Sequence, residues 1–144
     1  MHGLIDNLEF RVVGAPVANA SSTDNNSTRI DMADYESVAF LTVITDSTAT
    51  GVAGLKVEEN DADSDSGMAE VAGSALTATC VENDDINQLA LITEVFKPAK
   101  RFVQAVRTSA TANIAFGSVI AVLKPRRRPA VQGATIKASA YVAN

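Results

Sequence analysis

Short apolar runs separated by turn-forming residues are the feature that most limits how this chain can fold. The runs have the length of strands and are rich in β-branched residues, and turn signals recur about every ten residues. No helical spacing of apolar residues extends over an ordinary helix length. The pattern predicts an all-β fold, a β-sandwich or jelly-roll-like domain, with a small barrel as the alternative. The expected strands are residues 8–13, 35–44, 55–59, 88–95, 101–108, 112–123 and 135–142.

Three stretches need separate treatment. Residues 68–81 contain enough alanine for a helix, but Gly73 and the alternation of Thr77 with Thr79 favour strands and a turn. Gly117 interrupts the longest apolar run and predicts a bulge or close packing. Residues 101–108 have apolar side chains on both faces, which predicts burial on both sides, inside a sandwich or against another subunit.

The length of 144 residues fits one domain. We expect residues 1–30 to form an extended N-terminal strand or arm followed by a polar loop at residues 20–28, and residues 31–144 to form the sandwich. No signal peptide or membrane-spanning segment is expected, because no long apolar run is present. These features predict a soluble protein made in a cytoplasm.

The residue types argue against an enzyme. The chain has one histidine, His2, and one cysteine, Cys80, so no nucleophile with a well-placed base is expected. We expect Cys80 to be a small buried side chain. Glycine-rich phosphate loops are absent, and no cofactor is predicted. Carboxylates are plentiful, but the absence of tryptophan does not favour a sugar-cleaving cleft.

An acidic loop at residues 60–67 is the sharpest local feature. Asp61, Asp63 and Asp65 have the spacing of a calcium loop. Such a loop needs glycine at its sixth position and glutamate at its twelfth, where this chain has Ser66 and Ala72. We therefore predict no metal site and a solvated hairpin loop, and a looser calcium site is the alternative.

Charge is distributed unevenly along the chain. Most of the positive charge lies in the C-terminal half, and the acidic residues concentrate between residues 31 and 85. This predicts a molecule with one basic and one acidic region. The basic residues could dock onto an acidic protein surface or simply be solvated, and the lack of interleaved aromatic residues argues against nucleic acid. They form two groups, Lys97, Lys100 and Arg101, and then Lys124, Arg126, Arg127 and Arg128 between Pro125 and Pro129.

Three stretches resemble the small structural proteins with which tailed bacteriophages decorate or cement their heads. They are residues 35–38 leading into an apolar strand, residues 55–61 (LKVEEND) and residues 99–106 (AKRFVQAV). The resemblance covers roughly residues 35–130. The sequence departs from the pattern at Met68, where an aromatic residue often follows the acidic turn, and residues 130–144 extend beyond it.

The resemblance implies a virion protein on the outside of an icosahedral head, made in the host cytoplasm. Its partners would be the major capsid protein and further copies of itself, a trimer at a threefold site or, as the alternative, a dimer at a twofold site. A different virion protein, of the tail or head completion, and a carbohydrate-binding jelly roll are the alternative functions. The residues expected to face the shell are Lys124, Arg126, Arg127 and Arg128, with Leu4, Ile5, Leu8 and Phe10 of the N-terminal segment.

Overall fold

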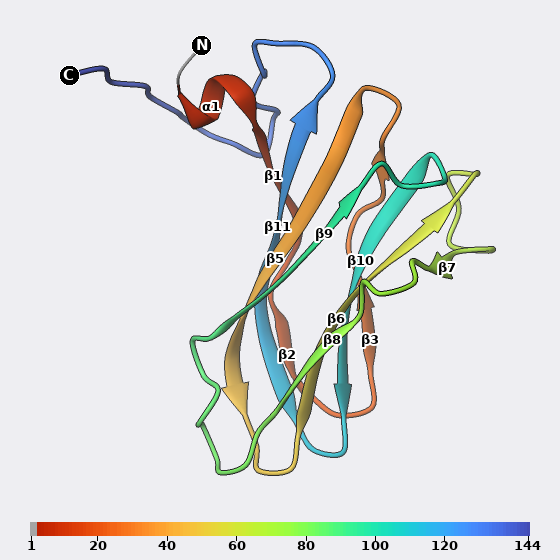
Figure 1. The fold of residues 1–144 in the computed structure, drawn as a ribbon. Helices are drawn as coiled ribbons and strands as arrows, with labels where there is room; N and C mark the ends of the chain where they lie inside the picture. Colours follow the sequence, from red (N-terminus) through yellow and green to blue (C-terminus); the bar gives the residue numbers. More distant parts are fainter. Residues whose placement is uncertain (1–2) are drawn as a thin grey trace.

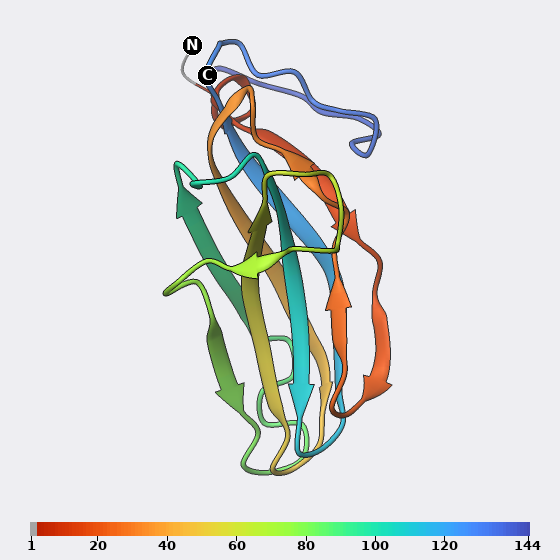
Figure 2. The ribbon, with the colours of Figure 1, turned by 90° about the vertical axis from the view of Figure 1, so that its right-hand side faces the viewer.

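Two antiparallel sheets packed face to face make up the fold (Figures 1 and 2). A computed structural model describes residues 3–144. The single helix among these residues has four residues, and no described helix is long and apolar enough to cross a membrane. The elements are α1 (Leu4–Asn7), β1 (Glu9–Gly14), β2 (Val17–Ala20), β3 (Asp24–Asn26), β4 (Ile30–Asp31), β5 (Tyr35–Ser47), β6 (Val52–Asn60), β7 (Ala69–Glu70), β8 (Leu76–Thr79), β9 (Ala90–Phe96), β10 (Phe102–Ala110) and β11 (Ile114–Pro125).

Each sheet has two long central strands flanked by shorter ones. Sheet A has the order β1-β11-β5-β9, and β2 pairs with β11 beyond the end of β1. Sheet B has the order β3-β10-β6-β7, with β4 added on β10 and β8 added on β6. The predicted all-β sandwich is confirmed, and the strands expected between residues 35 and 123 are present with small shifts at their ends.

The core lies between the two sheets and follows the alternation of the sequence. Val38, Phe40 and Ile44 of β5 point inward and are fully buried, and Val57 and Val103 meet them from sheet B. Every second side chain of a strand points to the same face, so the period of two in the sequence selects these residues for the core. Cys80 is also buried in this cluster, as expected.

Residues 9–31 belong to the sandwich instead of forming a separate arm. They supply β1 and β2 at one edge of sheet A and β3 and β4 at one edge of sheet B. The polar stretch at residues 20–28 therefore contains a strand, because the backbone of residues 24–26 pairs with β10 even though its side chains are polar. An edge strand with polar side chains needs little apolar burial of its own.

The prediction of a strand at residues 135–142 is wrong. The structure has no strand after β11, and the chain from residue 130 runs along the outside of β1 instead. Side chains of this segment, instead of its backbone, accept hydrogen bonds from the N–H groups at the edge of β1. Gln132 Oε1 accepts from Phe10 N (2.8 Å), and Thr135 Oγ1 accepts from Val12 N (3.1 Å). Ala138 and Ala140 are small, so a strand here would bury little apolar area. That burial would not offset the conformational entropy lost on ordering the segment.

A β-bulge at Gly117, as predicted, joins the two sheets. Phe116 pairs with Ile44 but Val119 pairs with Thr42, so two residues of β11 have no direct partner in β5. The displaced Gly117 carbonyl accepts a 2.8 Å hydrogen bond from Nη1 of Arg107, a buried residue of sheet B. The same nitrogen donates to the Ala15 carbonyl (2.7 Å), where the chain passes from β1 to β2.

Strand β10 is buried on both faces, as its sequence predicts. Val103 and Ala105 face the core, and Gln104 and Val106 are buried on the outer side. Gln104 donates to Glu58 Oε2 of the neighbouring strand at 2.9 Å. This burial is achieved within one chain, so β10 gives no sign of a subunit interface.

Candidate functional site

Three loops meet at one end of the sandwich and form what we call the basic end. They are residues 31–36, 97–101 and 124–129, and backbone hydrogen bonds join them. Lys97 N donates to Glu36 O at 2.8 Å, Met32 N to Arg101 O at 2.8 Å and Arg126 N to Asp34 O at 2.9 Å. Segments far apart in the sequence therefore form one continuous surface, and α1 and the C-terminus lie at the same end (Figure 1).

The basic loops and one group of acidic loops lie at opposite ends of the sandwich. The three loops of the basic end carry seven lysines and arginines and three carboxylates. The loops at the opposite end, residues 46–51, 80–89 and 111–113, carry Asp46, Glu82, Asp84 and Asp85 and no lysine or arginine. Hydrogen bonds hold these loops together too, from Thr50 N to Cys80 O (2.8 Å) and from Thr48 N to Asn113 O (3.0 Å). The predicted basic region thus lies at one end of the sandwich. The predicted acidic residues lie at both ends, because Asn60 pairs with Phe102 and so places the acidic loop next to residues 97–101.

Two cations of the basic end are neutralised by carboxylates beside them. Arg101 donates to both carboxylate oxygens of Asp31, at 2.9 and 2.7 Å. These hydrogen bonds lower the pKa of Asp31 from 3.8 to about 2. Lys124 Nζ lies 2.9 Å from Glu36 Oε2 and lowers the pKa of that carboxyl. Lys124, one of the predicted contact residues, is therefore already engaged within the chain.

Arg126, Arg127 and Arg128 differ from Lys124 in having no ion pair within residues 3–144. All three are exposed. They follow directly after β11 ends at Pro125, and past Pro129 the chain is tied down by the bond from Ala130 N to Asp6 O (2.9 Å). The three guanidinium groups thus project from a short segment that is fixed at both of its ends.

The N-terminal residues expected to face the shell lie next to this segment. Gln132 Nε2 donates to the carbonyls of Ile5 (3.1 Å) and Leu8 (2.8 Å) and so fixes α1 against the chain that follows the arginines. Leu4 is 71% exposed, whereas Ile5, Leu8 and Phe10 are half-buried. The structure therefore brings the two predicted sets of residues together, although more than a hundred residues separate them in the sequence.

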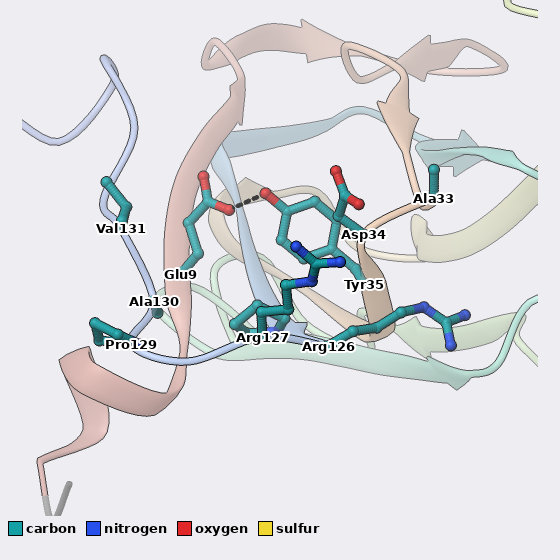
Figure 3. Close-up of a pocket in the computed structure, with 10 residues that line it drawn as sticks. Glu9, Ala33, Asp34, Tyr35, Arg126, Arg127, Pro129, Ala130 and Val131 are labelled. Atoms are coloured by element: carbon teal, nitrogen blue, oxygen red, sulfur yellow. Dashed lines mark hydrogen bonds between the residues drawn. The ribbon is translucent and has the colours of Figure 1, made fainter.

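A pocket of about 580 Å³ opens beside Arg126 and Arg127 (Figure 3). Its wall contains buried Glu9, which accepts a hydrogen bond from the Tyr35 hydroxyl. Arg11 Nη2 lies 3.0 Å from Glu9 Oε1 and 3.1 Å from the Tyr35 oxygen, and its guanidinium carbon is 5.7 Å from the centre of the tyrosine ring. Burial, followed by the nearby Glu9, raises the pKa of Tyr35.

Sequence reasoning did not find the Glu9, Arg11 and Tyr35 cluster. The available signal was a carboxylate and a guanidinium two residues apart in β1, which places both on one face of the strand. Tyr35 joins them only through the packing of β5 beside β11 and β1. Because the polar groups of this cluster are bonded to one another, the charged side chains of the pocket outside the cluster are those of Arg126, Arg127 and Asp34.

The acidic loop is bonded to an arginine. Arg29 Nε lies 2.6 Å from Asp63 Oδ1, and Arg29 Nη1 lies 2.8 Å from Asp65 Oδ1. Asn60 Nδ2 donates to two carbonyls of the same loop, those of Ser64 and Ser66, at 2.9 Å each. Within residues 3–144, no three histidine, cysteine or acidic side chains group as metal ligands would.

Cys80 makes a contact of 2.9 Å from Sγ to the Glu82 carbonyl, and burial raises the pKa of its thiol. A buried thiol with a raised pKa holds little thiolate, the reactive form. His2 lies outside the described residues.

Comparisons with known proteins bear on the fold. No protein-family model matches the sequence, and no curated protein matches it. Among solved structures, the phage PBSX exported protein XepA matches with a TM-score of 0.59 and 13% identity, over 99% of this chain and 46% of XepA. This chain thus spans about half the length of XepA. At this identity the likeness shows the shared sandwich fold and no more.

Two further structures match at lower TM-scores. A carbohydrate-binding module, CBM4, has a TM-score of 0.44 and 12% identity, over 83% of this chain and 71% of that one. A structure of Desmodium yellow mottle tymovirus has a TM-score of 0.34 and 8% identity, over 83% of this chain and 89% of that one.

Proposed function

We propose that the protein is a non-enzymatic structural component of a phage virion that binds the outside of the icosahedral head and stabilises contacts between capsomers. The sequence resemblance to decoration proteins introduces this function. The observation that carries it is the set of three exposed arginines without ion pairs, held between two anchored points at the basic end. The major capsid protein is the proposed partner.

The basic end suits an acidic protein surface. Guanidinium groups bind carboxylates through paired hydrogen bonds, and a fixed segment loses less conformational entropy on binding than a mobile one. A contact of this kind is weak when it is made once. A homo-oligomer that makes it several times on a symmetric shell gains by effective concentration. A trimer would suit a threefold site, and a dimer would suit a twofold site.

The test is binding to heads of the encoding phage prepared without this protein. We expect the variant Arg126→Ser, Arg127→Ser, Arg128→Ser to occupy heads at least about tenfold less than wild type at equal concentration, because each lost charge-assisted contact costs about 1 kcal/mol or more. Co-sedimentation with heads measures the occupancy.

The matched control carries lysine at the same three positions and keeps the positive charge. It should retain more binding than the serine variant, and this advantage should be largest at low ionic strength, where salt screens the attraction between charges least. Thermal unfolding shows whether both variants are folded. Wild-type occupancy by a folded serine variant would exclude the basic end as the shell contact.

A further inference from the structure

The outer face of sheet A carries a row of apolar side chains that crosses all four strands. Val12 of β1 pairs with Ile120 of β11, Ile120 pairs with Leu41 of β5, and Leu41 pairs with Ile92 of β9. All four side chains point away from the core, because their neighbours in each strand face inward. Ile92 is 57% exposed and Val12 is 38% exposed.

The apolar character continues on both sides of this row. The next row is Phe10, Val122, Ala39 and Glu94, and on the other side Val43 pairs with Ala90. Leu89 and Phe96, at the two ends of β9, are 54% and 59% exposed. Of the side chains in these two rows and in the Val43–Ala90 pair, Glu94 alone is charged.

Among residues 3–144, no other element covers this face. The C-terminal tail passes along β1 and bonds to the backbone of Phe10 and Val12, which is the edge of the sheet. Strand β9, at the opposite edge, pairs with β5 only. Four strands about 4.8 Å apart over seven residues give a face on the order of 400–500 Å². That area is as large as the largest apolar patches of monomeric proteins.

We propose that a second copy of this chain packs on the outer face of sheet A. The proposal rests on the homo-oligomer of the proposed function and names its contact surface. Two such faces together would bury about 1,000 Å², which is the lower limit for a specific interface. Sheets pack face to face in this way when both faces are apolar.

The charges around the face favour a second copy. Its periphery carries Glu94, Lys124 with its ion-pair partner Glu36, and Lys97, whose ammonium lies 5.2 Å from the centre of the Phe96 ring. Two copies thus bring together equal numbers of positive and negative charges, without net repulsion, even though the whole chain has a formal charge of −5.

A twofold axis parallel to the strands would place the basic ends of both copies on the same side. Such a contact is isologous, with the same residues on both copies, and produces a dimer. Both sets of arginines could then face one shell, as the proposed function requires.

The test is the self-association of the isolated protein by sedimentation velocity from about 1 µM to about 1 mM. Wild type is expected to form dimers. Ile92→Lys places a charge at the most exposed position of the apolar row and should weaken dimerisation at least about tenfold. Thr77→Lys is the matched control, because Thr77 is exposed on an edge strand of sheet B, and it should associate as wild type does.

A wild type that stays monomeric over this range would overturn the proposal, and so would an assembly that Ile92→Lys leaves intact. Thermal unfolding establishes that each variant is folded. The proposed function fails separately, in the head-binding assay with the arginine variants, because those residues lie outside the outer face of sheet A.

Discussion

The outer faces of the two sheets have opposite chemistry. The row through the middle of sheet A is Val12, Ile120, Leu41 and Ile92. On sheet B one row is Asp24, Thr108, Gly54 and Thr77, and another contains Gln104, Glu58 and Glu70. Both sheets bury their inner faces in the same core, so the requirement for a core does not explain the difference.

Under the proposed self-association, the two faces meet different surroundings. Lys56 Nζ lies 3.3 Å from Glu58 Oε1 on sheet B, so the polar side chains there partner one another and leave the outer surface charged and hydrated. The apolar side chains on the outer face of sheet A have no such partners among the residues that the structure describes. Exposed apolar patches of this size mark contact surfaces, whereas a face of ion pairs suits permanent exposure to water.

The largest expected effect is a difference in stability between substitutions on the two faces of strand β5. Phe40 of β5 is fully buried, and its neighbour Leu41 lies on the outer face of sheet A. Phe40→Ala should lower the free energy of unfolding by about 3–5 kcal/mol, because it removes a large side chain and leaves a cavity. Leu41→Ala should cost about 1 kcal/mol in dilute monomer.

Urea unfolding at low protein concentration measures both values. Equal costs for the two variants would mean that Leu41 is an interior residue, and the comparison of the two faces would fail.

The second effect concerns the buried arginine that connects the sheets. Arg107→Met removes the donor to the carbonyls of Ala15 and Gly117. Thr42 Oγ1 still donates to Gly117 O at 3.2 Å, so the Ala15 carbonyl loses its partner. We expect a loss of about 1–3 kcal/mol in urea unfolding.

Thr42→Val is the control, since it removes the other donor to Gly117 but leaves Arg107 in place, and it should cost less. A smaller loss for Arg107→Met than for Thr42→Val would contradict the role of the guanidinium.

The third effect is a pH dependence of stability that arises from an ion pair at the basic end. Asp31 has a pKa lowered to about 2 by Arg101, against 3.8 ordinarily. A carboxyl with a lowered pKa adds stability above its ordinary pKa and loses it as the pH falls through the folded-state value. The stability difference between wild type and Asp31→Asn should be about 0.5 kcal/mol at about pH 6, as for exposed ion pairs.

That difference should vanish as the pH falls from about 4 to about 2. Urea unfolding across this range measures it. A Leu41→Ala variant supplies the comparison, because its cost should not change with pH, and a constant difference for Asp31→Asn would refute the assignment of the ion pair.

The smallest effect concerns the edge of sheet A. Thr135→Val removes the acceptor for Val12 N, a bond exposed to water, so water can replace it. We expect at most about 0.5 kcal/mol in global stability. Amide hydrogen exchange at Val12 should become faster, while that at Phe10, which Gln132 still protects, should change less. Unchanged exchange at Val12 would show that the tail does not protect this edge.

The sequence alone determined the features that depend on local chemistry. A period of two separates inner from outer side chains, so the strands of residues 35–44 and 101–108, the all-β class and the buried Cys80 could be predicted. Gly117 marked the bulge because a glycine inside a strand weakens regular pairing. The exposure of the three arginines also followed from the sequence, since prolines on both sides end the strand.

Only the tertiary structure decided which strands are neighbours. Alternation defines two faces for each strand but not its partner or register, and these depend on contacts between distant residues. The apolar row therefore emerged only when β1, β11, β5 and β9 were placed side by side. Arg29 met Asp63 and Asp65 for the same reason. Residues 135–142 show the limit of alternation, because a chain with a strand-like pattern forms a strand only where a sheet edge can bury its side chains.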